Sequence, residues 1–155
     1  MTKANIGVFF YGSAIGNPQL CGYGGILFLT VDHFITFKAG LGVGTNNMAE
    51  LYTLKLLLIL ALNKQITNIQ EFDDSLLVII WIMGKFRIHN IQLAQILQEV
   101  IRLTNCFDKA DFKHIYRERN SLADSLANDG GKVQIGFWSI SEFQGSVRHD
   151  TFQGF

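Results

Sequence analysis

The stretch TNNMAELYTLKLLLILAL (residues 45–62) marks the point where the sequence changes from strand-like to helix-like. Its first three residues, Thr45, Asn46 and Asn47, have short polar side chains of the kind that cap the free N–H groups at a helix start. The residues that follow, Met48–Leu62, are good helix formers and are apolar nearly all round. We therefore predict a deeply buried helix over Met48–Leu62.

Three strand-like runs precede this helix. Ile6–Phe10 is short and apolar and ends in a Tyr-Gly-Ser sequence. Tyr23–Thr30 and His33–Ala39 are rich in residues with high β propensity. Only Val31 and Asp32 separate these two runs, which fits a tight hairpin. We expect the chain to open with an antiparallel meander of three strands.

The rest of the chain alternates between strand and helix patterns. We predict a fourth strand over Ile66–Phe72, a short helix over Ser75–Met83, an amphipathic helix over Ile91–Leu103, a fifth strand over Asp111–Tyr116 and a last helix over Asn120–Asn128. This order predicts an α/β fold with a five-stranded mixed sheet, in which parallel strands adjoin the meander and helices cover the faces. We expect one domain over residues 1–131 and a C-terminal extension over 132–155 without a sustained period.

Composition limits the possible classes of protein. Hydrophobic residues make up 48% of the 155 residues and charged residues 17%, which excludes a disordered chain. The 13 basic and 13 acidic side chains cancel, so net charge gives no argument for nucleic-acid binding. Two cysteines, no visible secretory signal and apolar runs too short to cross a membrane predict an intracellular location, nuclear or cytoplasmic.

Acidic residues stand at the ends of the predicted elements. Glu50 lies in the first turn of the buried helix, Asp74 follows the fourth strand, and Asp124 lies in the first turn of the last helix. The carboxyl ends of parallel strands are where α/β sheets bind ligands. Clustered carboxylates repel one another unless a divalent cation lies among them. An alternative is that Glu50 and Asp124 are helix-capping residues, Glu50 in a capping box with Asn47.

The order of the motifs resembles that of ribonuclease H, in particular the reverse-transcriptase-like ribonuclease H domains of plant genomes, many derived from retroelements. The matching motifs are Tyr11-Gly12-Ser13-Ala14-Ile15-Gly16-Asn17-Pro18, Gly22-Tyr23-Gly24-Gly25, Thr45-Asn46-Asn47-Met48-Ala49-Glu50, Asp74-Ser75, and His114 to Asp124. The resemblance covers roughly residues 6–131. It implies a sheet on which four acidic residues hold two Mg²⁺ (or Mn²⁺) ions, and cleavage of the RNA strand of an RNA/DNA hybrid.

Carried over by position, the resemblance implies that Glu50, Asp74 and Asp124 are metal ligands. His114 falls where a family histidine often assists water activation or product release, although a structural role at a strand end is an equal alternative. Tyr11 is the departure, because the family has an aspartate there that bridges both metals. A phenol is neutral at pH 7 and bulkier than a carboxylate. We therefore expect one metal site to be lost or weakened.

The resemblance also implies that backbone amides and small polar residues contact a hybrid in its minor groove. The candidate contacts are Gly12, Ser13, Gly16, Asn17, Thr45, Asn46, Asn47, Lys85 and Arg87. Turn, cap and solvated-surface roles account for most of them equally well. The hypothesis is thus a nucleic-acid-binding ribonuclease H-like domain with impaired two-metal catalysis. The alternatives are an active hybrid ribonuclease and a domesticated protein-interaction module.

Overall fold

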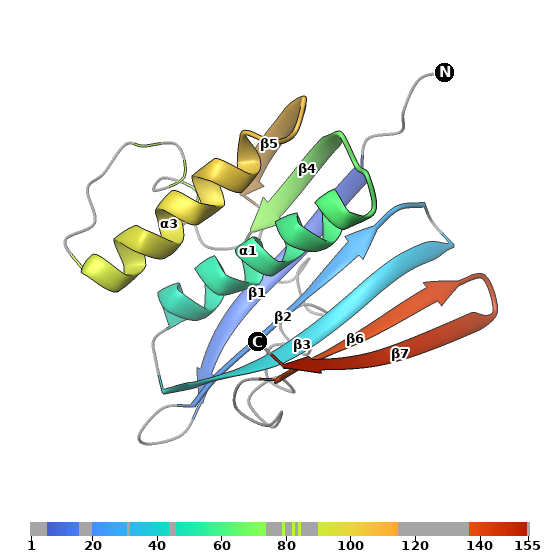
Figure 1. Ribbon diagram of the computed structural model, residues 1–155, viewed down its shortest axis with the longest axis horizontal. Helices are drawn as coiled ribbons and strands as arrows, with labels where there is room; N and C mark the ends of the chain where they lie inside the picture. Colours follow the sequence, from blue (N-terminus) through green and yellow to red (C-terminus); the bar gives the residue numbers. More distant parts are fainter. Residues whose placement is uncertain are drawn as a thin grey trace.

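The computed structural model describes residues 6–15, 20–30, 32–43, 46–73, 79, 82, 84, 90–114 and 137–154. Its elements are β1 (Ile6–Ile15), β2 (Leu20–Phe28), β3 (His33–Val43), α1 (Asn46–Asn63), β4 (Asn68–Asp73), α3 (Ile91–Thr104), β5 (Lys109–His114), β6 (Phe137–Gln144) and β7 (Val147–Gly154). Seven strands form one sheet in the order β5-β4-β1-β2-β3-β6-β7. Helices α1 and α3 lie together over one face of this sheet (Figure 1).

The predicted fold class is confirmed by the pairing of the strands. Strands β1, β2 and β3 form an antiparallel meander, and β4 pairs in parallel with both β1 and β5. Helix α1 contains the whole of the predicted range and begins two residues earlier, at Asn46. Strand β5 begins two residues before the predicted start, at Lys109, and is described as far as His114.

The sheet has two strands more than the five expected. Strands β6 and β7 come from the C-terminal extension, and β6 pairs antiparallel with β3 from His33–Gln144 to Ala39–Trp138. The turn between them places Gly145 at a φ of 61°, a conformation that glycine adopts without strain. Serine, glutamate and glutamine interrupt the apolar pattern of this segment, and its partner β3 lies about a hundred residues away. Local periodicity therefore did not reveal the hairpin.

The core explains why α1 is apolar nearly all round. Leu51, Leu54, Leu57 and Leu58 of α1 are all fully buried. They belong to one cluster with side chains of the sheet and of α3, so the helix is covered on more than one side. Helix α3 is amphipathic, as predicted, and buries only the face that carries Ile96, Val100 and Leu103. The sequence of α1 is thus that of an inner helix and the sequence of α3 that of an outer one.

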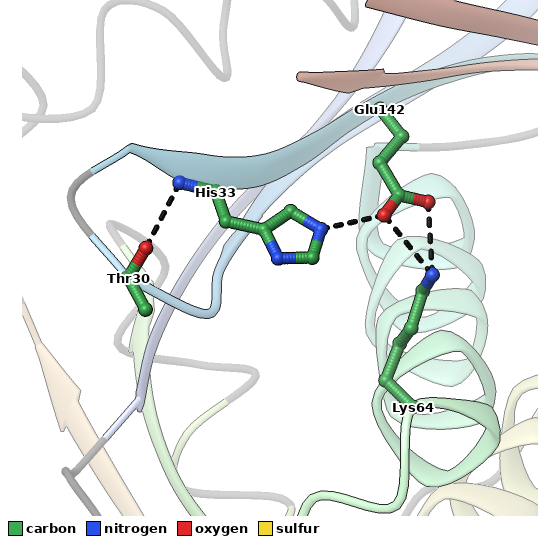
Figure 2. A network of polar contacts seen from close by, with 4 residues as sticks. All are labelled: Thr30, His33, Lys64 and Glu142. Carbon is green, nitrogen blue, oxygen red and sulfur yellow. Dashed lines mark hydrogen bonds and ion pairs between the residues drawn. The ribbon is translucent and has the colours of Figure 1, made fainter. Parts of the chain in front are cut away.

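Three polar side chains connect the C-terminal strands to the helix layer (Figure 2). His33 Nε2 at the start of β3 lies 2.5 Å from Glu142 Oε2 on β6. Lys64, just after α1, donates to both carboxylate oxygens of Glu142 at 2.9 and 3.1 Å. The hydrogen bonds from Lys64 and then from His33 lower the pKa of Glu142 below its ordinary value. We call these three residues the Glu142 clamp.

Part of the prediction falls on residues outside the described ranges. Of the predicted helix over 75–83, the structure describes only Ile79 and Ile82, which are both helical, and Ile79 is buried. The predicted last helix over 120–128 lies outside the described ranges. Within those ranges, neither helix has the combination of length and apolarity that crossing a bilayer needs.

Replacing the acid of the Glu142 clamp, Glu142→Gln, should lower the free energy of unfolding by about 1 kcal/mol or less at pH 7, the range of partly exposed ion pairs. Because the folded state lowers the pKa of Glu142, its stabilisation is present above the ordinary glutamate value of 4.5 and is lost as the pH falls below it. Urea unfolding of both proteins at several pH values measures this difference. Asp111→Asn, at an exposed site, is the control and should change little. A constant difference down to pH 3 would contradict the assignment.

Truncating the aromatic side chain of β6, Trp138→Ala, should cost about 3 kcal/mol, because Trp138 is 9% exposed and belongs to the core cluster. Denaturant unfolding measures the loss. Val147→Ala on β7 is the control, since Val147 is 59% exposed and its truncation should cost less than about 0.5 kcal/mol. Equal midpoints for Trp138→Ala and the unmodified chain would show that β6 is dispensable to the core.

Candidate nucleic-acid and metal site

The parallel part of the sheet defines the place where a site is expected. Phe10 of β1 pairs with Asp73 of β4, and Asp73 pairs with His114 of β5. This row contains the last residues of β4 and β5, so both strands end at the same edge. Ligands of α/β sheets bind beyond such carboxyl ends. The expected metal ligand Asp74 is the next residue in the chain and lies outside the described residues.

Tyr11 follows directly after the Phe10–Asp73 pair. On its other side β1 continues in register with β2, and there Tyr11 pairs with Gly24, which is buried. Strand β1 has β4 on one side and β2 on the other, so Tyr11 lies on an inner strand of the sheet rather than at its rim. The tyrosine therefore stands in the middle of the sheet, one residue past the row that ends β4.

Glu50 lies in the helix layer. It is the fifth residue of α1, which packs on β1 and β2, and it is only 6% exposed. Burial of a carboxylate is costly unless hydrogen bonds, a cation or a proton compensate for it. Two expectations about Glu50 need correction, because α1 begins at Asn46. Glu50 lies in the second turn rather than the first, and Asn47 lies inside the helix rather than at the capping-box N-cap position.

The other predicted site residues divide into two groups. Among described residues, His114 is exposed and ends β5, and Gly12 and Ser13 continue β1 opposite Tyr23 and Gly22. Asn46 and Asn47 are the first two residues of α1. The predicted residues outside the described ranges are Asp74, Asp124, Gly16, Asn17, Thr45, Lys85 and Arg87.

The number of acidic side chains limits how many cations the site can balance. Within the described ranges there is no group of three His, Cys, Asp or Glu side chains that would hold a metal ion, and Glu50 is the one expected carboxylate ligand that those ranges include. Together with Asp74 and Asp124, Glu50 would bring three negative charges. One divalent cation would leave this set with a net charge of −1, and two would leave it with +1. Three carboxylates thus fall one short of the four that would balance two Mg²⁺ or Mn²⁺ ions.

One buried acid was missed by the sequence analysis. Glu71 on β4 is 1% exposed, and neither of its carboxylate oxygens has a hydrogen-bond partner among the described residues. Burial raises the pKa of Glu71 well above its ordinary value. Glu71 lies in the interior of its strand, whereas the predicted site acids lie at the ends of elements. The signal lay in the strand alternation, which puts Glu71 on the same side of β4 as the buried Ile69.

Comparison with known proteins identifies the fold and the family. The family model described as Reverse transcriptase-like matches residues 10–130. The chain belongs to the reverse transcriptase-like family. It is a ribonuclease H-like domain, because its fold matches those of two solved ribonucleases H.

A bifunctional protein of Mycobacterium tuberculosis, Rv2228c, is 31% identical to the chain over 121 residues. The match covers 76% of this chain, which spans only a third (33%) of the length of that relative. The N-terminal RNase H domain of Rv2228c, solved as a fusion with maltose binding protein, matches with a TM-score of 0.76 and 29% identity. That match covers 83% of this chain and 94% of the solved chain.

Two further solved structures share the fold of this chain. RNase H1 of the archaeon Halobacterium salinarum matches with a TM-score of 0.75 and 26% identity, over 82% of this chain and 97% of its own. LC11-RNase H1, solved in complex with an RNA/DNA hybrid, matches with a TM-score of 0.70 and 24% identity, over 82% of this chain and 96% of its own. Family-level similarity thus covers the β1 to β5 region and ends before β6.

Proposed function

We propose that this domain binds RNA/DNA hybrids and that its two-metal cleavage of the RNA strand is impaired. The observation that carries the proposal is the position of Tyr11, directly after the Phe10–Asp73 pair in the middle of the sheet. Asp74 follows Asp73 in the chain, so continuation of the parallel register would bring Asp74 beside Tyr11. A phenol at that position supplies neither the charge nor the second oxygen of a bridging carboxylate.

The metal chemistry follows from the acids that remain. Glu50 and Asp74, with Asp124, would hold one Mg²⁺ or Mn²⁺ ion. When bound, such an ion would polarise a phosphate oxygen or activate a water. The stabilisation of both the attacking and the leaving oxygen requires a second ion, which three carboxylates support poorly. His114, which is exposed at the end of β5, would assist water activation or product release at the same edge, the role that the family resemblance implies.

Hybrid binding would use the residues that follow Tyr11 and those that begin α1. Gly12 and Ser13 continue β1, and Asn46 and Asn47 begin the helix that packs on β1. Their backbone amides and short polar side chains suit a minor groove and its 2′-hydroxyls. LC11-RNase H1, which shares the fold, was solved with an RNA/DNA hybrid bound. Gly16, Asn17, Thr45, Lys85 and Arg87 complete the proposed contact set.

Two further parts of the proposal concern origin and place. A plant, retroelement-derived origin rests on the motif resemblance. An intracellular location, nuclear or cytoplasmic, rests on the low cysteine count and on a substrate that forms inside cells.

Restoring the acid, Tyr11→Asp, should increase cleavage of a labelled RNA/DNA hybrid by on the order of 100-fold or more, the scale of several kcal/mol of metal-assisted charge stabilisation. Cleavage is measured with Mg²⁺ and, separately, with Mn²⁺. Tyr11→Asn is the matched control, because it has the size of aspartate without the charge, and it should show no such gain. Rapid turnover by the unmodified chain, unchanged in Tyr11→Asp, would favour the active ribonuclease instead.

The unmodified chain should bind a hybrid without cleaving it efficiently, and the Kd should rise with salt concentration because phosphate contacts release counterions. Fluorescence anisotropy with a labelled hybrid at several salt concentrations measures this dependence. A DNA duplex of the same sequence is the control ligand, and it should bind more weakly because it lacks 2′-hydroxyls. Absence of association with the hybrid even at low salt would favour the protein-interaction module.

A further inference from the structure

The further inference concerns Glu71, the buried acid in the middle of β4. Its neighbours in the sheet are apolar, since Glu71 pairs with Val8 of β1 and with Phe112 of β5. The next residue on the same side of β4 is Ile69, which belongs to the core cluster beneath α1 and α3. The carboxyl group of Glu71 is therefore enclosed at the interface between the sheet and the helix layer, where water does not reach it.

Among the residues that the structure describes, the elements around Glu71 give it no charged partner. Asp73 is the other acid on β4, and Lys55 of α1 is paired with Glu99 of α3 at 2.5 Å. None of the described residues donates a hydrogen bond to either oxygen of Glu71, and burial alone accounts for its raised pKa. The titratable and charged side chains on the neighbouring elements are Tyr11 on β1, Glu50, Tyr52 and Lys55 on α1, Glu99 and Arg102 on α3, and Lys109, Asp111, Lys113 and His114 on β5.

We propose that Glu71 is a proton-dependent switch in the core, which is neutral while α1 and α3 cover this face of the sheet and whose ionisation loosens this helix layer. An ionised carboxylate at this position would require water or a counter-charge that the closed interface does not provide. The neutral acid also loses hydrogen bonds to water, but this cost is much smaller than that of a buried charge. The seating of the helix layer on the sheet is thus coupled to the occupancy of one proton site.

The sign of the coupling follows from linkage. The folded state binds the proton of Glu71 more tightly than the unfolded state does, because burial raises its folded pKa above the ordinary value of 4.5. The contribution of Glu71 to the free energy of unfolding is therefore fully present below pH 4.5. It is lost progressively as the pH rises toward the folded pKa. Within that window the unfolding equilibrium constant increases up to tenfold per pH unit. The opposite sign holds for Glu142, whose folded pKa is lowered.

The test compares the full chain with Glu71→Leu and Glu71→Gln by urea unfolding between pH 5 and pH 9. Neither variant titrates at position 71, and Glu71→Gln keeps the size of the side chain, so it separates the proton effect from packing. We expect the stability of the unmodified chain, relative to each variant, to decrease as the pH rises. Hydrogen exchange at alkaline pH, referenced to Glu71→Leu, should show faster opening of α1 and α3 in the unmodified chain.

Glu142→Gln is the control for the same measurement, because its difference from the unmodified chain should stay constant between pH 5 and pH 9 and shrink only below pH 4.5. Parallel stability profiles of the unmodified chain, Glu71→Leu and Glu71→Gln across pH 5 to 9 would overturn the proposal. Equal hydrogen exchange of α1 and α3 in the unmodified chain and in Glu71→Leu at alkaline pH would also overturn it. The measurement requires neither a nucleic acid nor a metal, so its result is independent of the catalytic status of the domain.

Discussion

The burial of α1 between the sheet and α3 is the constraint on which the rest of this structure depends. A helix that is apolar nearly all round is unstable in water and must be covered on more than one side. The strands supply one cover and the amphipathic α3 supplies another, with Leu54 and Leu57 fully buried between them. Once α1 is fixed on β1 and β2, Glu50 near its start is fixed as well. The placement of one acidic side chain thus follows from the packing of an apolar helix.

The site depends equally on the strand order. Because β1 lies between the antiparallel β2 and the parallel β4, the residue after Phe10 occupies the middle of the sheet, and the resemblance implies a bridging acid at that position. Tyr11 keeps the strand intact, since an aromatic residue is a good strand former. The same substitution removes a charge from the proposed metal cluster. Tyrosine at position 11 is therefore compatible with the strand but not with the proposed two-metal chemistry.

The sequence predicted the parts of the fold that local patterns encode. The all-round apolar pattern of α1, the single apolar face of α3 and the β-rich runs of the meander were each visible within one segment, and the structure confirms them. The C-terminal hairpin was missed, because β6 is specified by its pairing with the distant β3 rather than by its own period. Glu71 was missed because it lies in the interior of a strand, although strand alternation puts it on the buried side with Ile69. The roles of Tyr11, Glu50, Asp74 and Asp124 at a metal site come from motif order alone and stay predictions, and Asp74 and Asp124 also lie outside the described residues.

The C-terminal hairpin has a consequence for the behaviour of the molecule in a crowded solution. Without β6 and β7, the free edge of the sheet would be β3, whose side chains include Phe34, Ile35 and Phe37. Exposed apolar edges act as templates for intermolecular β-sheet growth. The hairpin replaces this edge with β7, where Arg148 and Asp150 form an ion pair at 2.9 Å and both side chains are exposed. Charged residues on an edge strand disfavour pairing with another chain. The hairpin therefore lowers the tendency of this edge to start intermolecular β-sheet growth.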